Sequence, residues 1–118
     1  MDICKQDAWL SLLELVEREG KFDYAICTHT LEDVYSPVVA LEMMPRIAKA
    51  GIISMPSLWA ELNHVESTQW LGFMHHRWIF DFDKEGNMLL LPKLGFLSSL
   101  WPNGIGNFSD HNSDIFYQ

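Results

Sequence analysis

The sequence predicts an α/β fold: a helix, two parallel strands joined by a crossover helix, and an antiparallel hairpin. Three observations predict it. Residues 5–19 carry apolar side chains at helical spacing, residues 22–57 alternate between apolar runs and a helical segment, and residues 77–93 place two apolar runs around a turn. The runs at 22–28 and 52–55 are almost continuously apolar, which is typical of parallel strands covered on both faces.

The first predicted helix has one apolar face. Its side chains fall at the i, i+3, i+4, i+7 positions, at Trp9, Leu12, Leu13 and Val16. Asp7 is a candidate N-cap, and Gly20 suits the left-handed stop position after the last turn. We therefore expect this face to pack against the core.

The crossover helix has a clear start and an awkward end. Ser36 and Pro37 supply a cap and a first-turn proline. Gly51 is the expected C-terminal stop. Pro45 lies inside the helical pattern, where it removes a backbone hydrogen bond and clashes with the preceding turn. We therefore expect a kink or a broken last turn at 43–46.

The remainder of the chain is less regular. Residues 57–68 are expected to form a loop with a short helix, and the DKEGN segment between the two runs of 77–93 predicts the turn of a β-hairpin. Residues 102–118 are rich in Gly, Asn, Ser and Asp, so we expect a loosely ordered tail. The length of 118 residues is that of a single domain.

Composition excludes several classes of function. The net charge is −8 with only 8 basic residues, which argues against a nucleic-acid partner. No apolar run approaches the roughly 20 residues of a membrane span, and the N-terminus lacks the layout of a secretory signal. Cys4 and Cys27 form neither a metal-binding spacing nor a disulfide framework. We therefore expect a cytoplasmic protein with no membrane partner.

Short motifs follow one another in a fixed order between residues 20 and 94. A strand opens at Phe22-Asp23, and a His-x-Leu-Glu loop follows with His29, Leu31 and Glu32. A basic helix end then occurs at Arg46–Lys49, and a glycine turn at Gly51. In this order and spacing they resemble the second half of class I S-adenosylmethionine-dependent methyltransferases, of the type 11-like group. Two positions depart from that pattern: Asp33 stands where the family has a second histidine, and Ala50-Gly51-Ile52 replaces a Pro-Gly-Gly turn.

The resemblance implies a partial Rossmann-like methyltransferase sheet and methyl transfer from S-adenosylmethionine to a small molecule. The loop after the first strand lies where α/β sheets bind ligands. There the resemblance makes His29 the candidate base, with Glu32 and Asp33 orienting it, because histidine can pass a proton near neutral pH. The acceptor side is assigned to His75, His76 and Arg77, whose guanidinium suits a carboxylate or phosphate.

The cofactor-binding half of the family pattern is absent before Phe22. A glycine-rich β-α-β unit needs about 30 residues, and 21 precede Phe22. We therefore expect one truncated methyltransferase-like domain, either a C-terminal half or a shortened relative, that alone binds the cofactor poorly or not at all. No cofactor-binding residue is assigned. The strand at 22–28 would then have an open edge, which predicts a homo-oligomer through that edge or the first helix folded across it.

Two other functions remain open from the sequence. One is a non-catalytic α/β module that self-associates through the sheet edge. The other is a small metal-dependent enzyme that uses the histidines. If 75–78 is a strand, His75 and His76 point to opposite faces, so a metal would need partners such as His29, Glu61 or His64. No metal site is therefore predicted.

Overall fold

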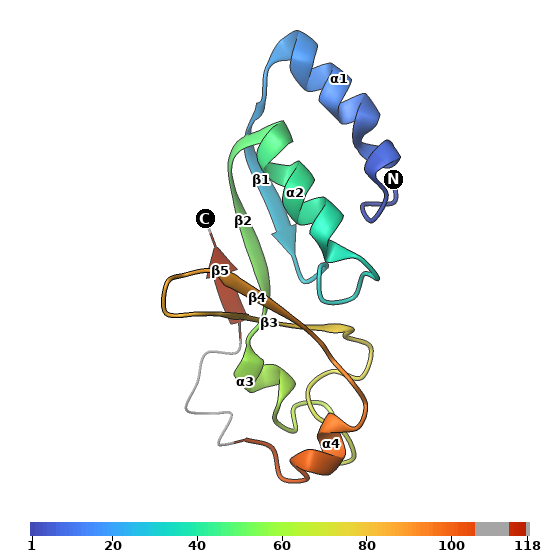
Figure 1. The fold of residues 1–118 in the computed structure, drawn as a ribbon, viewed down its shortest axis with the longest axis vertical. Helices are drawn as coiled ribbons and strands as arrows, with labels where there is room; N and C mark the ends of the chain where they lie inside the picture. Colours follow the sequence, from blue (N-terminus) through green and yellow to red (C-terminus); the bar gives the residue numbers. More distant parts are fainter. Residues whose placement is uncertain (106–113, 118) are drawn as a thin grey trace.

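The computed structural model, which describes residues 1–105 and the backbone of 114–117, confirms the α/β class (Figure 1). A 3₁₀ turn leads into α1, and β1, α2 and β2 follow. The helices and strands are the 3₁₀ turn Gln6–Trp9, α1 (Leu10–Glu19), β1 (Phe22–Thr28), α2 (Pro37–Ile47), β2 (Ala48–Pro56), α3 (Leu58–Glu61), β3 (Trp78–Phe82), β4 (Met88–Pro92), α4 (Leu97–Leu100) and β5 (Asp114–Tyr117).

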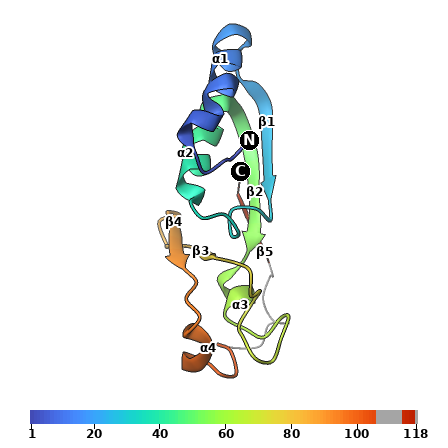
Figure 2. The ribbon, with the colours of Figure 1, turned by 90° about the vertical axis from the view of Figure 1, so that its right-hand side faces the viewer.

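The crossover β1-α2-β2 is the first half of the molecule. β1 and β2 pair in parallel, from Phe22 opposite Ala48 to Thr28 opposite Ser54, and β5 adds to β2 in the antiparallel direction. α1 and α2 lie on the same side of this sheet (Figures 1 and 2). The core between them is formed by Trp9, Leu31, Ala40, Met43, Ile47, Ala48, Met55 and Phe80.

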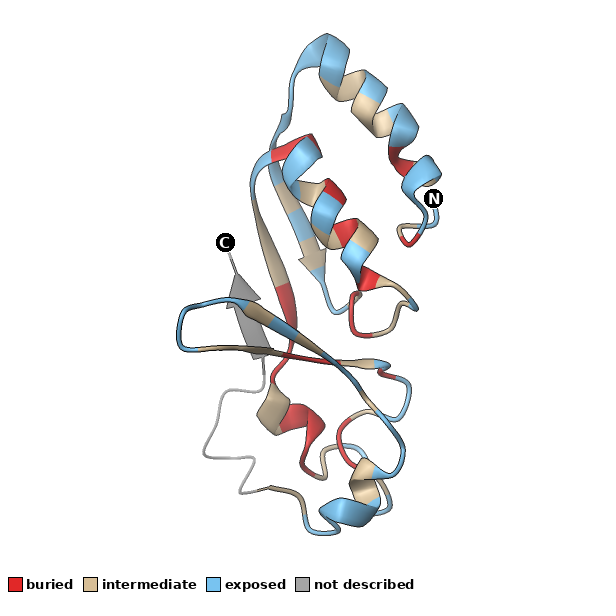
Figure 3. Cartoon of the chain, viewed as in Figure 1, coloured by how far each residue is buried: buried red, intermediate tan, exposed pale blue. Residues whose placement is uncertain are grey.

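β1 is covered on one face only, so the expectation of a strand buried on both faces is wrong. Ala25 and Cys27 pack against the core. Their neighbours on the other face are exposed: Phe22 by 43%, Tyr24 by 50% and Ile26 by 72% (Figure 3). In the part of the chain that the structure describes, no strand pairs with the outer edge of β1. α1 packs beside α2 and leaves that edge open (Figure 2).

α2 corrects two details of the predicted crossover helix. It begins at Pro37 as expected, but it continues through Pro45 to Ile47, so its last turn is not broken. Ala48 then enters β2 directly, and Gly51 lies inside the strand rather than at the helix end. A Cβ at Gly51 would lie 2.7 Å from the carbonyl oxygen of Ala25. The absence of a side chain at Gly51 therefore allows the close approach of β1 to β2 at Ala25.

The first helix matches its prediction at the C-terminus but not at the N-terminus. Gly20 follows the last helical residue and has φ = 88°, a positive value that favours glycine. Asp7 lies inside the 3₁₀ turn, which Lys5 precedes, and therefore caps no helix. The apolar face contacts the core as predicted, through Leu12, Leu13 and Val16.

The second half of the molecule contains the predicted hairpin and short helix. β3 and β4 pair antiparallel, and Asp83 closes their turn by accepting from the backbone and side chain of Asn87. α3 is capped by Ser57, whose side chain accepts from the N–H of Ala60. α4 and β5 were not predicted.

The segment expected to be a loose tail is described in part. The N–H of Ile105 donates to the carbonyl oxygen of Leu62 (3.0 Å), and 114–117 form β5 on the edge of β2. Residues 106–113 and 118 lie outside the described residues. Among the residues that are described, no helix has the length and apolar character needed to cross a bilayer.

Candidate functional site

The loop after β1 leaves the sheet at a sharp turn. The N–H of His29 still donates to the carbonyl oxygen of Ser54 on β2 (2.8 Å), and its φ of 45° then turns the chain away. A left-handed conformation at a residue other than glycine is uncommon and is found at functional sites. The His29 ring stays at the surface, with 53% of its side chain exposed. The candidate base is therefore reachable from solvent at the carboxyl end of β1.

Glu32 is the buried member of this loop. It is 1% exposed, and its Oε1 lies 3.5 Å from Nδ1 of His29. Neither carboxylate oxygen accepts a hydrogen bond from another residue in the described part of the chain. Burial raises the pKa of the Glu32 carboxyl, because removal from water disfavours its charge. The buried Glu32 carboxyl thus lies beside the exposed His29 ring.

The main chain of Glu32 connects the two halves of the predicted site. Its carbonyl oxygen accepts from the N–H of Arg77 (2.6 Å) and of Trp78 (3.2 Å). The Trp78 indole also donates to the carbonyl oxygen of Val34 (2.8 Å). These bonds seat the loop after β1 on the start of β3, although about 45 residues separate them in sequence. The structure therefore brings the predicted catalytic and acceptor sides together.

Asp33, His75 and His76 form the centre of this contact. Oδ1 of Asp33 lies 3.6 Å from Nε2 of His75 and 3.8 Å from Nε2 of His76. The two histidine rings are in edge-to-face contact, with centroids 4.4 Å apart. The premise that adjacent histidines point to opposite faces is wrong here, because β3 begins only at Trp78 and the histidines lie in the preceding loop.

A second layer of charged groups supports His76. Nδ1 of His76 is hydrogen-bonded to Oε1 of Glu61, and Nζ of Lys93 lies 2.5 Å from the other oxygen, Oε2. Lys93 also donates to the carbonyl oxygen of Phe73 (2.5 Å). Glu61 is 1% exposed, so its carboxylate is compensated inside the protein.

Sequence reasoning named Glu61 only as a possible metal partner and missed Lys93. Lys93 follows the apolar run of β4, and its N–H donates to the carbonyl oxygen of Arg77 (2.8 Å). Its place in the hairpin was therefore predictable, since it extends the pairing of β3 with β4. Its partner Glu61 was not, because the two lie 32 residues apart.

Arg77 and His64 occupy different surroundings from the rest of the predicted set. The Arg77 side chain is exposed, and its backbone makes the contacts with Glu32 and Lys93. His64 faces the carbonyl oxygens of Ser67, Trp70 and Pro102 instead of the histidine cluster. It is therefore a structural residue of the segment after α3.

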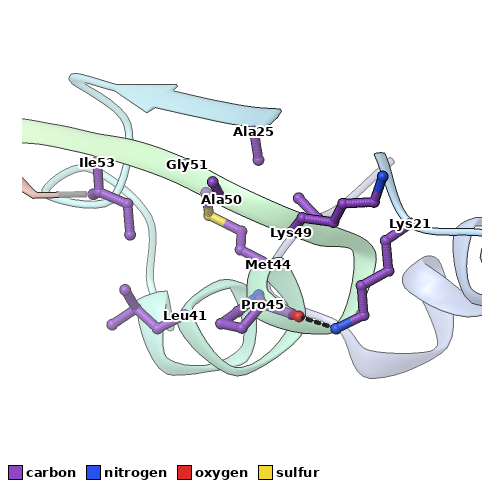
Figure 4. Close-up of a pocket in the computed structure, with 10 residues that line it drawn as sticks. Lys21, Ala25, Leu41, Met44, Pro45, Lys49, Ala50, Gly51 and Ile53 are labelled. Carbon is purple, nitrogen blue, oxygen red and sulfur yellow. Dashed lines mark hydrogen bonds between the residues drawn. The ribbon is translucent and has the colours of Figure 1, made fainter. Parts of the chain in front are cut away.

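Two of the cavities near these elements differ in character. A cavity of about 150 Å³ adjoins Glu61, His76 and Lys93 and is also lined by Leu94, Gly95, Leu97 and Ser98. A larger one of about 290 Å³ lies between α2 and the strands, with Lys21 donating to the carbonyl oxygen of Pro45 at its rim (Figure 4). The cavity of about 290 Å³ lies toward the N-terminal end of β1, and none of Asp33, Glu61, His75, His76 and Lys93 lines it.

Comparison with known proteins supports a methyltransferase-like chain. No curated protein and no solved structure matches the sequence. A protein-family model does match, that of methionine biosynthesis protein MetW, over residues 1–66 of 118. The matched segment contains β1, the His29 loop, α2 and β2 and ends just after α3. The chain belongs to the MetW family and is methyltransferase-like.

Proposed function

We propose that this protein takes part in methyl transfer from S-adenosylmethionine to a small molecule, and that the described residues supply mainly the acceptor side of the site. One observation carries the proposal. The carbonyl oxygen of Glu32 accepts from Arg77 and Trp78, which places the loop of His29 and Asp33 against the histidine pair. Acid, base and cation groups thus converge at the carboxyl end of β1, where α/β sheets bind their ligands.

His29 is the proposed base, and Glu32 positions it. Methyl transfer depends mainly on holding donor and acceptor in line, and a base is needed only where the acceptor must lose a proton. The exposed His29 ring can take that proton, and the buried Glu32 carboxyl lies 3.5 Å from its Nδ1. Arg77 is the proposed contact for an acidic group of the acceptor.

Cofactor binding by this chain alone is proposed to be weak. The segment before β1 folds as a 3₁₀ turn and α1, and the sequence before Phe22 carries one glycine, Gly20. A glycine-rich turn is what lets a backbone approach a nucleotide closely. The type 11-like resemblance is part of the same proposal, in which the described residues correspond to the C-terminal part of a methyltransferase site.

Amide chemical shifts measured during titration with S-adenosylmethionine test this proposal. We expect small, fast-exchange shifts in residues 29–33 and 57–61, at the carboxyl ends of β1 and β2. ATP serves as the control ligand, because it shares the adenosine but lacks the sulfonium group. Shifts absent from these residues, or confined to the cavity of Figure 4, would contradict the proposal.

Activity gives a second readout. With an acceptor that must be deprotonated, His29→Gln should lower methyl transfer by at least about 100-fold, the usual contribution of a general base. Lys84→Gln, in the exposed hairpin turn, is the control and should leave the rate unchanged. Equal rates for His29→Gln and the unmodified protein would remove His29 from the role of base.

Self-association is a second candidate function, favoured by the open edge and exposed face of β1. Ile26 is 72% exposed, and Phe22 and Tyr24 share its face. We propose a second copy of the chain as the occupant, because twofold pairing of β1 with itself satisfies the backbone of both copies at once. Oligomerisation through β1 is compatible with methyl transfer.

Sedimentation velocity over a range of protein concentrations tests self-association. We expect a dimer that Ile26→Lys converts to a monomer, since a charge on an edge strand opposes pairing. Leu89→Lys on β4, at a position 41% exposed, is the matched control and should leave the dimer intact. A monomer at all concentrations, or a dimer unaffected by Ile26→Lys, would refute this role for β1.

A further inference from the structure

We infer that Asp33, His75 and His76 form a mononuclear site for a divalent first-row transition metal of the zinc class. One ligand atom from each of the three residues lies within 4.8 Å of the other two. Zinc ligands sit at about 2.0–2.2 Å, which places tetrahedral neighbours roughly 3.4 Å apart. The separations of 3.6 Å and 3.8 Å from Asp33 Oδ1 to the two Nε2 atoms are close to this spacing.

The hydrogen bonding of His76 leaves its Nε2 available for a metal. Nδ1 is hydrogen-bonded to the carboxylate of Glu61, which fixes the proton of a neutral ring on that nitrogen. Nε2 then presents a lone pair toward Oδ1 of Asp33, which is also an acceptor. Two acceptors that face each other repel, and a cation between them turns that repulsion into attraction.

Asp33 meets the same condition from its own side. Its Oδ1 is buried and accepts no hydrogen bond from any residue in the described part of the chain. Buried polar atoms almost always have a partner, so an atom without one requires an explanation. A metal ion supplies that partner. The competing explanation is a doubly protonated His76 shared by Asp33 and Glu61, and the experiment below separates the two.

Glu61 and Lys93 provide the supporting layer that metal sites require. A histidine that binds a metal commonly donates its other N–H to a carboxylate, which orients the ring and raises its basicity. Glu61 holds this position for His76, and Lys93 in turn holds Glu61. The imidazole pair with one carboxylate suits zinc, iron or cobalt better than magnesium or calcium, which prefer oxygen ligands.

The site would remain open on one side. The side chains of His75 and Asp33 are 60% and 42% exposed, so a fourth ligand can reach the metal from solvent. Three protein ligands with one open position are typical of catalytic rather than structural zinc. The metal would also join the loop after β1 to the loop before β3. Metal binding by Asp33, His75 and His76 does not depend on the proposed methyl transfer, because it involves neither the cofactor nor the acceptor.

Metal binding by the purified full chain, freed of metal with a chelator, tests the inference. We expect calorimetry with ZnCl₂ to give one equivalent, and Co²⁺ to give the intense visible bands of a tetrahedral complex. Asp33→Asn, His75→Gln and His76→Gln should each weaken zinc binding at least tenfold and abolish those bands. Asp23→Asn, an exposed aspartate at the opposite end of β1, is the matched control and should bind zinc normally.

Glu61→Gln tests the supporting layer and should weaken zinc binding by about 10- to 100-fold. Circular dichroism establishes that each variant is folded before its affinity is compared. Absence of stoichiometric binding by the unmodified chain overturns the inference and leaves the protonated His76 as the explanation. So does equal zinc affinity in Asp33→Asn and Asp23→Asn.

Discussion

Glu32 and Glu61 are equally buried but differ in what surrounds their carboxylates. Each is 1% exposed. Glu61 is bonded to His76 and Lys93. In contrast, the oxygens of Glu32 accept no hydrogen bond from another described residue, and Oε1 lies 3.5 Å from Nδ1 of His29. A protein gains no stability by burying a carboxylate without partners. We therefore expect Glu61 to stabilise the structure, and Glu32 to serve the proposed chemistry beside His29.

The two glutamates also lie on opposite sides of the same histidine cluster. Glu61 lies at the end of α3 and contacts His76, while Glu32 precedes Asp33 in the loop after β1. Removing the carboxylate of Glu61 should therefore lower the free energy of unfolding far more than removing that of Glu32. The following predictions test that difference, from the largest effect to the smallest.

Glu61→Ala should lower the free energy of unfolding by about 3–5 kcal/mol, the cost of leaving buried charges without their partner. Here the group left uncompensated is the ammonium of Lys93, whose side chain is 10% exposed, together with the ring of His76. Urea unfolding followed by circular dichroism measures the change. Glu85→Ala in the exposed turn is the control and should change stability by less than about 0.5 kcal/mol. A loss below about 1 kcal/mol would show that the contacts of Glu61 with Lys93 and His76 do not stabilise the fold.

Gly72→Ala should lower stability by about 2–3 kcal/mol, because it combines backbone strain with a clash. Gly72 has φ = 58°, and a Cβ there would lie 2.7 Å from Cα and 2.8 Å from the carbonyl oxygen of Glu61. Gly86→Ala is the matched control: its φ is 85°, but nothing lies within 4 Å of the added atom. It should lose only about 1 kcal/mol from strain. Equal losses in the two variants would mean that the contact with Glu61 is unimportant.

The crossover was predictable because its signals are local. The apolar run of β1, the proline at the start of α2 and the hairpin turn each depend on a few neighbouring residues, and the structure confirms them. The cap predicted at Ser36 is wrong in one respect, because its side chain makes no capping hydrogen bond. Pro45 misled the prediction of the helix end. Its missing hydrogen bond falls in the last turn, where the helix continues to Ile47 and leads straight into β2.

The site was only half predictable because its contacts are not local. The sequence placed His29 and its acids at the end of β1, but it could not show that Asp33 faces His75 and His76. That contact depends on where β3 begins: a strand that began at His75, three residues before Trp78, would place the two histidines on opposite faces. The pairing of Glu61 with Lys93 likewise required the fold of the second half. The exposure of β1 was missed because an apolar run does not report whether both faces are covered.

Glu32→Gln should raise the free energy of unfolding by about 1 kcal/mol, since a neutral side chain of the same shape costs less to bury than an unpaired carboxylate. Glu61→Gln makes the same chemical change at equal burial and should lower stability by about 2 kcal/mol, because the ammonium of its partner Lys93 is charged. Urea unfolding of both variants in parallel gives the contrast directly. A loss of stability in Glu32→Gln as large as in Glu61→Gln would erase the distinction between the two regions.

His64 provides the smallest and most specific test, because its contribution depends on pH. Nδ1 lies 2.9 Å and 3.0 Å from the carbonyl oxygens of Ser67 and Trp70, and Nε2 lies 2.7 Å from that of Pro102. Carbonyl oxygens only accept, so both ring nitrogens must donate, and the Pro102 contact in particular raises the pKa of His64 above its ordinary value of 6.5. The three contacts therefore favour the protonated form of the ring over the neutral one.

A histidine whose pKa is higher in the folded than in the unfolded state stabilises the fold fully below the unfolded value. That contribution is lost as the pH rises from about 6.5 through the folded pKa. The melting temperature of the unmodified chain should thus fall more steeply above pH 6.5 than that of His64→Gln, and the difference between the two curves isolates His64 from the other histidines. Parallel curves would mean that one nitrogen carries no proton, and that the segment after α3 is held to Pro102 by contacts other than this ring.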